Sequence, residues 1–402
     1  MDNHPFIPVV LGSDINTYNT ARIFYEAYGI KTHVFGKSQS SPSYLSKITE
    51  FHLEPEIDDE ERLFKVISRF AMKNHDKKIL CLGAGDHYCL YLAKLSDSFP
   101  ENVIVPMISA EQMIFVQNKA NFYKLCEEVG IGYPKTIIHE PGQSLDFPVP
   151  FDYPLILKPA VSTSAYEYDF EGSKKVYIIE SREELRETME KIYAAGYPDE
   201  LIIQDKIPGR DDTMYVLTAY VDQQGSIKMF SLGHVLLQEH TPGAMGNYAV
   251  IMTAEKPILL DMARNFIDKI GYKGICHFDI MYDERDHSYN FFEINTRQGR
   301  NHYYVQGSGV NMAELLVRDY VLGETLEYQE ATEPSVLLTV PRKVAKDYIK
   351  GPNGEAMIRL MKAGKAYNPL FLKGDNHPIR LARIAKSLLS HFGKFKTYYE
   401  KE

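Results

Sequence analysis

Cysteine is scarce in this 402-residue chain, which has only four, and none of them stands in a Cys-x-x-Cys pair. This scarcity argues against a disulfide framework or a zinc site, so we expect four buried thiols in a reducing compartment. No run of eighteen apolar residues occurs, so a membrane span is not expected. The first residues, Met1 to Pro5, lack the basic start and apolar stretch of a secretory signal. These absences together predict a cytoplasmic protein.

The charge of the chain is unevenly distributed. From Arg342 to Glu402, 14 Lys and Arg residues stand against 5 Asp and Glu, whereas the rest of the chain carries 31 against 49. An acidic body argues against nucleic acid as the main partner. The basic tail indicates either a solvated helical face or a region that attracts an anionic substrate or a membrane surface. The sequence does not indicate the oligomeric state.

Length and apolar content predict two or three domains with buried cores. Residues 1–118 alternate strand-like runs, at 6–11, 32–35 and 78–82, with helix-like stretches such as 16–28. This alternation predicts an α/β lead domain built on a parallel sheet, with its ligand edge at the strand C-termini. The glycine turns at 12 and 83–85 do not complete Gly-x-Gly-x-x-Gly, so a dinucleotide site is not expected.

The following residues, 119–330, predict an α+β region of two lobes, about 119–205 and 206–330. Strand signals occur at 155–159, 175–180, 201–204, 215–221, 228–232 and 249–252, with helical segments near 181–195 and 257–270. The segment 202–212, a strand that runs into Pro208 and Gly209 and then acids, is typical of a hinge where an adenine inserts. An ordinary strand-to-turn exit is the alternative. Residues 331–402 are expected to form a basic, mostly helical C-terminal extension.

Three oxygen-bearing side chains near the end of this region form the strongest candidate site. The apolar strands 274–282 and 289–295 flank a polar turn, so an antiparallel hairpin would place Asp279 opposite Glu293 or nearly so. Asn295 would share the face of Glu293, because side chains two apart on a strand point the same way. Facing carboxylates repel one another, and Mg²⁺ prefers such oxygen ligands. A metal site is therefore favoured over a surface hairpin with outward polar groups.

Two lysines are candidate anion-binding groups. Lys158 ends an apolar strand signal, where a buried ammonium is costly unless it meets an anion. A nucleotide phosphate and a structural ion pair both satisfy that condition. Lys119 stands just inside a helix start, where a solvent-exposed lysine is the common alternative.

The order of these features resembles the ATP-grasp superfamily. The resemblance covers roughly residues 1–325 and is carried by Lys119, Leu157-Lys158-Pro159, Gln204 to Gly209, Asp279, and Glu293 to Arg297. It implies ATP and Mg²⁺ as cofactors and an acyl-phosphate mechanism. By this resemblance, Lys119 and Lys158 would hold ATP phosphates, and Asp279, Glu293 and Asn295 would hold Mg²⁺.

The resemblance implies further roles around the nucleotide and the reacting acid. Gln204, Asp205 and Ile207 would line the adenine pocket, and Asp211 would meet the ribose. Arg297 would stabilise the acyl phosphate and the tetrahedral intermediate, and Arg300 is a weaker candidate for a substrate carboxylate. Two features depart from the family pattern: the loop from Val161 to Tyr166 lacks glycine, and His277 stands where some of these ligases carry an arginine.

A narrower resemblance is to the D-aspartate ligases of Gram-positive cell-wall synthesis. It is carried by five motifs and extends into the tail at Val340 to Lys343; the motifs are Leu11 to Asp14, Gln204 to Gly209, Ser231 to His234, Gly246 to Tyr248 and Glu293 to Arg300. It implies that D-aspartate is activated at its β-carboxylate and joined to the lysine ε-amine of an anionic peptidoglycan precursor. Alternatives are an ATP-grasp ligase for another amino acid or dipeptide, or a non-catalytic nucleotide-binding regulatory module. A biotin-dependent carboxylase is less favoured because no Met-Lys-Met carrier motif occurs.

Overall fold

A computed structural model describes residues 4–161, 168, 170, 172–241, 243–244, 246–300 and 302–399. Its first sheet runs in the order β3-β2-β1-β4-β5, and every pairing is parallel. The strands are β1 (Phe6–Leu11), β2 (Thr32–Gly36), β3 (Thr49–Leu53), β4 (Lys78–Gly83) and β5 (Val103–Ile104). Helices α1 (Ile15–Tyr28), α2 (Glu60–Lys73) and α3 (Asp86–Leu95) connect them. The predicted parallel sheet is confirmed.

A four-stranded antiparallel sheet follows along the chain, in the order β6-β9-β7-β8. The strands are β6 (Thr136–His139), β7 (Leu155–Pro159), β8 (Tyr177–Ile179) and β9 (Leu201–Asp205). Helix α7 (Arg182–Ala194) begins where Ser181 accepts a hydrogen bond from the Glu184 amide. Its buried Leu185 and Met189 join the apolar side chains of β7 and β9 in one core. Helix α5 (Lys119–Glu128) precedes this sheet, after α4 (Ala110–Gln117).

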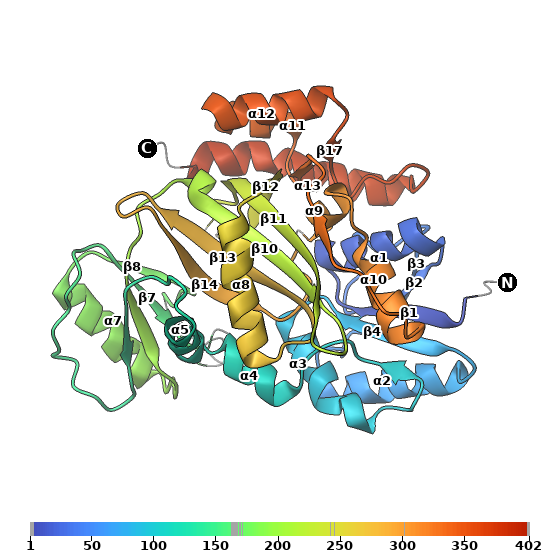
Figure 1. Cartoon of the computed structure of the whole chain (residues 1–402), viewed down its shortest axis with the longest axis horizontal. Helices are drawn as coiled ribbons and strands as arrows, with labels where there is room; N and C mark the ends of the chain where they lie inside the picture. The colour runs from blue at the N-terminus through green and yellow to red at the C-terminus, as the bar shows by residue number, and fades with distance from the viewer. Residues whose placement is uncertain are drawn as a thin grey trace.

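The largest sheet has the order β14-β13-β10-β11-β12-β16-β17, with β15 beside β11. Its members are β10 (Met214–Val221), β11 (Ile227–Gln238), β12 (Tyr248–Ala254), β13 (Gly274–Asp283), β14 (Ser288–Asn295), β15 (Gln329–Ala331), β16 (Val336–Leu338) and β17 (Ala366–Tyr367). Helix α8 (Pro257–Ile270) lies along this sheet (Figure 1), where Phe266 packs edge-on against Phe278 of β13. Helices α9 (Tyr303–Gly307) and α10 (Met312–Leu316) and a π-helical turn (Val317–Val321) follow β14.

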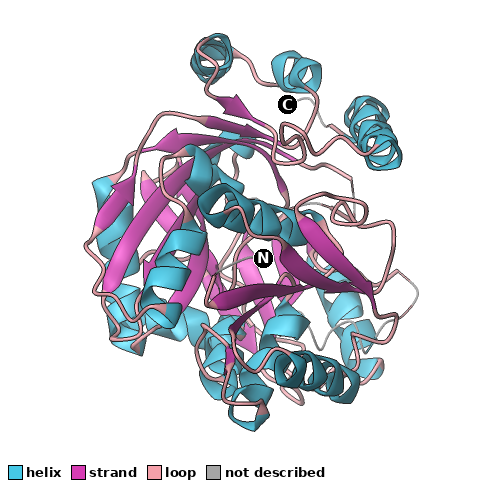
Figure 2. Ribbon diagram, turned by 90° about the vertical axis from the view of Figure 1, so that its right-hand side faces the viewer, coloured by secondary structure: helices cyan, strands magenta, loops and turns pink. Residues whose placement is uncertain are grey.

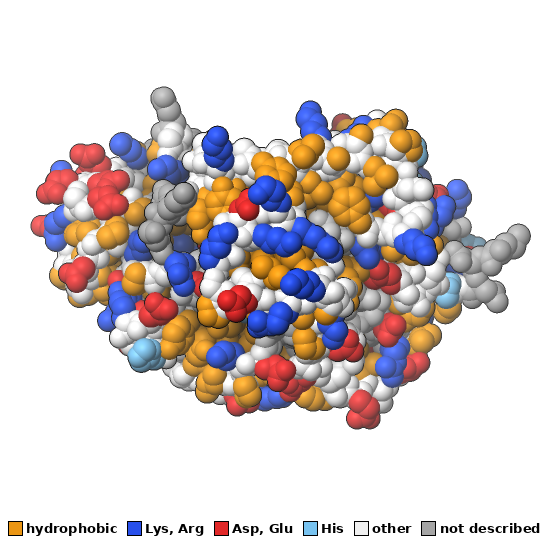
Figure 3. All heavy atoms as spheres, turned by 90° about the horizontal axis from the view of Figure 1, so that it is seen from above, with side chains coloured by type: hydrophobic (Ala, Val, Ile, Leu, Met, Phe, Trp, Pro, Cys, Tyr) orange, Lys and Arg blue, Asp and Glu red, His pale blue; other side chains and the backbone are white. Residues whose placement is uncertain are grey.

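The C-terminal segment adds the helices α11 (Arg342–Tyr348), α12 (Gly351–Lys362) and α13 (Pro378–Tyr398). They lie at the top of the molecule, above the strands (Figure 2). Lys and Arg side chains gather on this face among hydrophobic ones (Figure 3). Strands β16 and β17 come from the same segment and extend the large sheet, so residues beyond 330 share its core.

Two expectations that were drawn from the composition can be compared with the structure. All four cysteines are buried free thiols, as predicted. Within the described part of the chain, every helix is too short or too polar to cross a bilayer. The large fold features therefore agree with the predicted α/β lead domain followed by an α+β region of two lobes.

Candidate active site

The hairpin of β13 and β14 brings the predicted acidic side chains together. In its antiparallel register Asp279 pairs with Glu293, and His277 pairs with Asn295, so the predicted pairing of Asp279 with Glu293 is confirmed. The Asn295 Nδ2 donates to Asp279 Oδ2 at 3.1 Å. The hydroxyl of Tyr248, on β12, donates to Asp279 Oδ1 at 2.6 Å. Three oxygen-bearing side chains therefore meet on one face of the large sheet.

The two carboxyl groups are electrostatically unequal. Burial, together with the neighbouring Glu293, raises the pKa of Asp279 to about 7. Burial acts in the same sense on Glu293, but Lys119, Lys175 and Lys158 outweigh it and hold the pKa of Glu293 below its usual range. A divalent cation would remove the repulsion between the two groups, and two carboxylates with one amide oxygen are the donors that Mg²⁺ prefers. The residues present therefore fit a magnesium ion.

Two buried lysines face this acidic hairpin. Lys119 is the first residue of α5, after the N-cap Asn118, and its Nζ lies 3.3 Å from Glu293 Oε2. Lys158, on β7, donates from Nζ to the Tyr123 hydroxyl at 3.1 Å. Both lysines are buried, with 6% and 7% of their surface exposed. The structure thus places Lys119 inside the site and not in solvent.

Lys158 lies in surroundings that disfavour its charge. Its Nζ lies 5.7 Å from the ring centre of Tyr123 and 5.6 Å from that of Phe292. Burial, with a smaller contribution from the positive charge of Lys119, lowers the pKa of Lys158 to about 7. An anion beside this ammonium would offset both effects, which makes a phosphate a suitable partner.

Arg297 links the hairpin to the first sheet. Its Nε and Nη2 donate to the two carboxylate oxygens of Asp86, at 2.7 and 2.9 Å. Asp86 begins α3, directly after the Gly83-Ala84-Gly85 turn that ends β4. Burial opposes ionisation of Asp86, but Arg297 holds its pKa below the usual range. This bidentate pair fixes the guanidinium plane at the carboxyl edge of the parallel sheet.

His277 lies beside this arginine. Its Nδ1 is 3.2 Å from the Arg297 carbonyl oxygen. Burial and the positive charge of Arg297 lower the pKa of His277 to about 4, so the imidazole is neutral at pH 7. It therefore adds no positive charge to that of Arg297.

A cleft of about 120 Å³ is lined by Tyr248, His277, Asp279, Glu293, Asn295 and Arg297. Arg300 is exposed at the cleft and also lines a second cavity. Sequence reasoning missed Tyr248 and Lys175 as lining residues of this cleft. The Gly246 to Tyr248 motif was a usable signal for Tyr248, whereas an exposed lysine such as Lys175 carries none.

The residues predicted for the nucleotide base lie on and after β9. Gln204 is buried, and its Nε2 donates to Thr136 Oγ1 at 2.7 Å. Gln204 pairs with Ile156, two positions before Lys158 on β7. Asp205 accepts from Arg285 Nη2 at 2.8 Å.

Ile207 and Asp211 follow on the chain toward the large sheet. Ile207 is buried, at 8% exposed. Asp211 accepts from the Gln238 amide and from His240 Nε2, both at 2.9 Å. These contacts engage its carboxylate at the end of β11, so its contact with a ribose stays a prediction. In the glycine-free loop from Val161 to Tyr166, all residues after Val161 lie outside the described part of the chain.

Solved structures with the same fold include several ATP-grasp enzymes. L-amino acid ligase from Bacillus licheniformis matches with a TM-score of 0.55 at 16% identity, over 83% of this chain and 75% of that one. The ADP complex of N5-carboxyaminoimidazole ribonucleotide synthetase matches with a TM-score of 0.61 at 12% identity, over 98% of both chains. The biotin carboxylase domain of Hydrogenobacter thermophilus 2-oxoglutarate carboxylase, solved with MgADP, matches with a TM-score of 0.62 at 14% identity, over 83% of this chain and 74% of that one. At these identities the likeness establishes the fold.

A sequence comparison is more specific. No model of a known protein family matches the chain. A D-aspartate ligase of Enterococcus faecium is 34% identical over 412 residues, which cover 99% of this chain and 98% of that protein. Together with the ATP-grasp architecture, this similarity over the full length shows that the chain belongs to the D-aspartate ligase family of carboxylate–amine ligases.

Proposed function

We propose that this protein is a D-aspartate ligase that uses ATP and Mg²⁺ to activate the β-carboxylate of D-aspartate as an acyl phosphate. It then transfers the aspartyl group to the lysine ε-amine of an anionic peptidoglycan stem precursor. The observation that carries the proposal is the face-to-face arrangement of Asp279, Glu293 and Asn295 with the buried Lys119 and Lys158. The 34% identical D-aspartate ligase supports the choice of substrate, and neighbours solved with ADP or MgADP support the cofactors.

The first step requires positive charge around the triphosphate. Lys119 and Lys158 bind phosphate oxygens, and Asp279, Glu293 and Asn295 would hold magnesium, which would offset the negative charge of the phosphates. Gln204, Asp205 and Ile207 contact the adenine, and Asp211 contacts the ribose. The substrate carboxylate oxygen forms a bond to the γ-phosphorus while the bond from that phosphorus to ADP breaks. Arg300 binds the carboxylate of the amino-acid substrate.

The second step forms the amide. The acceptor nitrogen attacks the acyl carbon, the bond from carbon to the phosphate oxygen breaks, and inorganic phosphate leaves as the nitrogen loses a proton. Arg297 stabilises the oxyanion of the tetrahedral intermediate, because Asp86 already holds its guanidinium in one plane. No reorientation of that group is then needed when charge develops.

The proposal assigns one task to each part of the chain. Residues 1–118 supply the substrate-binding edge of the parallel sheet, residues 119–330 form the ATP-grasp domain with lobes at about 119–205 and 206–330, and residues 331–402 form the basic extension. We expect the enzyme to work in the cytoplasm, where ATP and the precursor are available. The positive charge of the basic extension attracts an anionic partner.

A phosphate-release assay tests the proposal. Purified protein is incubated with MgATP, D-aspartate and a lysine-containing muropeptide, and L-aspartate replaces D-aspartate in a parallel sample. Phosphate release should require D-aspartate and the muropeptide together, and the product mass should show one added aspartyl group. Equal turnover with L-aspartate would contradict the stereochemistry. ATP binding without ADP formation, with a full set of D- and L-amino acids, would favour a non-catalytic module instead.

A further inference from the structure

A second cavity, of about 290 Å³, adjoins the catalytic cleft. Its walls come from both ends of the chain: Asp14 and the segment Ser40–Pro42 near the N-terminus, and the face of α13 that carries Arg383 and Ser387. Arg300 lines this cavity and the cleft alike. The two spaces therefore meet at one side chain.

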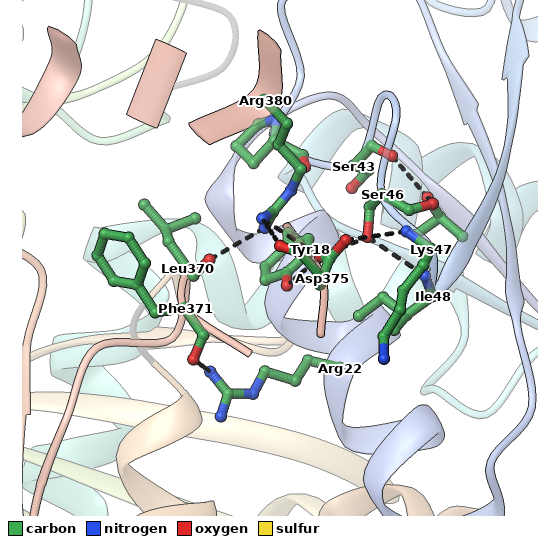
Figure 4. A network of polar contacts seen from close by, with 12 residues as sticks. Tyr18, Arg22, Ser43, Ser46, Lys47, Ile48, Leu370, Phe371, Asp375 and Arg380 are labelled. Carbon is green, nitrogen blue, oxygen red and sulfur yellow. Dashed lines mark hydrogen bonds and ion pairs between the residues drawn. The ribbon is translucent and has the colours of Figure 1, made fainter. Parts of the chain in front are cut away.

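The walls of this cavity are fixed by a buried polar network (Figure 4). Arg380, which is 2% exposed, donates from Nε to the Pro42 carbonyl at 2.8 Å and lies 3.2 Å from Asp375 Oδ2. Asp375 in turn accepts from the hydroxyls of Tyr18, at 2.7 Å, and Ser46, at 2.8 Å. These bonds tie α13 to the first domain, so the cavity exists before any ligand enters.

Positive charge stands at this cavity in two exposed arginines, Arg300 and Arg383. Arg383 donates to the Gln39 carbonyl, which is neutral, so this bond leaves its charge in place. The wall also holds two acids: Glu239 lies 2.8 Å from His391 Nε2, and Asp14 accepts a hydrogen bond from a backbone amide at the start of α1. Glu239 acts electrostatically on Arg300, so Arg383 is the cation that we expect to meet an anionic group in the cavity.

The catalytic cleft and the second cavity differ in volume, so they suit different ligands. A cleft of about 120 Å³ suits a small amino acid, whereas a bulky acceptor must approach the acyl phosphate from an adjoining space. We propose that the cavity on α13 binds the amine acceptor, with Arg383 recognising one of its anionic groups, a carboxylate or a phosphate, while Arg300 holds the amino-acid carboxylate at the boundary of the two spaces. This inference rests on the proposed ligase function. At about 290 Å³ the cavity takes one end of the acceptor and not the whole molecule.

Four variants of α13 test this site. Ser387→Glu places a carboxylate in the cavity, one helical turn after Arg383, where it would pair with that arginine and repel an anion. Ser387→Gln adds the same bulk without charge. Ser390→Glu adds the same charge on the exposed face of the helix, outside the cavity lining. Arg383→Gln is an independent second test that removes the cation itself.

Two activities of each variant are compared. Hydroxylamine, a nucleophile too small to need the cavity, traps the acyl phosphate as a hydroxamate with release of phosphate, and this rate should be the same in all variants. The KM for the lysine-containing muropeptide should rise about 10-fold in Ser387→Glu relative to Ser387→Gln, which is about 1.4 kcal/mol. Ser390→Glu should match the wild-type protein, and Arg383→Gln should raise the KM.

A second acceptor substrate shows which anionic group of the acceptor the cavity recognises. Two forms of the muropeptide are compared, one linked to a nucleotide diphosphate and one without it. The form without the diphosphate should keep the Ser387→Glu effect if the cavity binds a peptide carboxylate, and lose it if the cavity binds a phosphate. Equal acceptor KM values for Ser387→Glu, Ser387→Gln and Arg383→Gln would overturn the site, even with hydroxamate formation intact. Absence of any D-aspartate-dependent hydroxamate in the wild-type protein would overturn the proposed function itself, and the acceptor site with it.

Discussion

The Asp279 carboxyl group is buried, accepts two hydrogen bonds and faces a second carboxylate. Replacing it by Asn keeps the shape but removes one of the two carboxylate charges that would bind the metal. Asp279→Asn should therefore lower kcat at least about 100-fold, a loss of about 2.7 kcal/mol of transition-state stabilisation. The Tm should stay the same or rise, because the amide removes a charge that burial and Glu293 disfavour. Phosphate release and thermal unfolding measure the two effects; near-normal turnover would remove Asp279 from the metal site.

The depressed pKa of Lys158 predicts that ATP binding is linked to proton uptake. With a pKa of about 7, Lys158 is mostly neutral at pH 8 in the free enzyme. The ATP phosphates favour the ammonium form, so binding at pH 8 should take up close to one proton, and affinity should fall as the pH rises above 7. Calorimetry in buffers of different ionisation enthalpy measures this uptake. Lys158→Met should abolish it, and unchanged uptake in that variant would assign the proton to another group.

Single residues differed in how far the sequence could place them. Asp279 and Glu293 lie on one hairpin, so the local pattern brings them close together. The register set by the turn would pair Asp279 with Phe292, and a shift between Asp279 and Ile280, which the pattern does not reveal, pairs it with Glu293. The contact of Tyr248 with Asp279 crosses strands separated in the sheet by β10 and β11, and no local pattern predicts it. The Asp86–Arg297 pair joins two different sheets and depends on how they pack.

At the scale of elements, the pair of Asp86 and Arg297 connects the start of α3 to the end of β14. Asp86→Asn would leave the guanidinium with one weaker partner and free it to turn. We expect kcat to fall roughly 10-fold, because an arginine that must reorient gives up part of its oxyanion stabilisation. The KM for ATP should not change, because the change is at the acyl group. Asp86→Glu should recover part of the rate; the same rate in Asp86→Asn as in the wild-type protein would show that Arg297 needs no support.

Helices and strands with a clear hydrophobic period could be predicted from the sequence. Strands that are recognisable only by their pairing with distant strands could not. Helix α8 has the predicted bounds, Pro257 and Ile270, because proline opens it and Gly271 ends it in a left-handed conformation. Strand β13 was also predicted almost to its ends. Strand β3, with the sequence Thr49 to Leu53, is an edge strand with weak alternation and was missed. Strands β16 and β17 are too short to recognise without their pairing partners, β12 for β16 and β16 for β17.

At the scale of the whole molecule, the buried ion pair of Arg380 and Asp375 holds the C-terminal helix to the first domain. Arg380→Met would leave Asp375 buried without its cation, which should destabilise the protein by about 3–5 kcal/mol. The double variant with Asp375→Asn should lose less than the sum of the two single variants. Urea unfolding measures these differences. Lys386→Met, on the exposed face of the same helix, should stay within about 0.5 kcal/mol of the wild-type protein; a similar loss in that control would mean that α13 is fragile everywhere.

The network around Arg380 and Asp375 can form only after most of the chain has been synthesised. Tyr18 bonds to Asp375, which follows 357 residues later, so a ribosome must add all of these residues before the hydroxyl can meet its partner. At translation speeds of roughly 5–20 residues per second, the wait is about 20 to 70 s. During that time the first domain must fold with Tyr18 and Ser46 still facing water. A nascent chain stalled before the last helix should therefore be cleaved by protease near Ser46, and release of the full-length chain should bring protection.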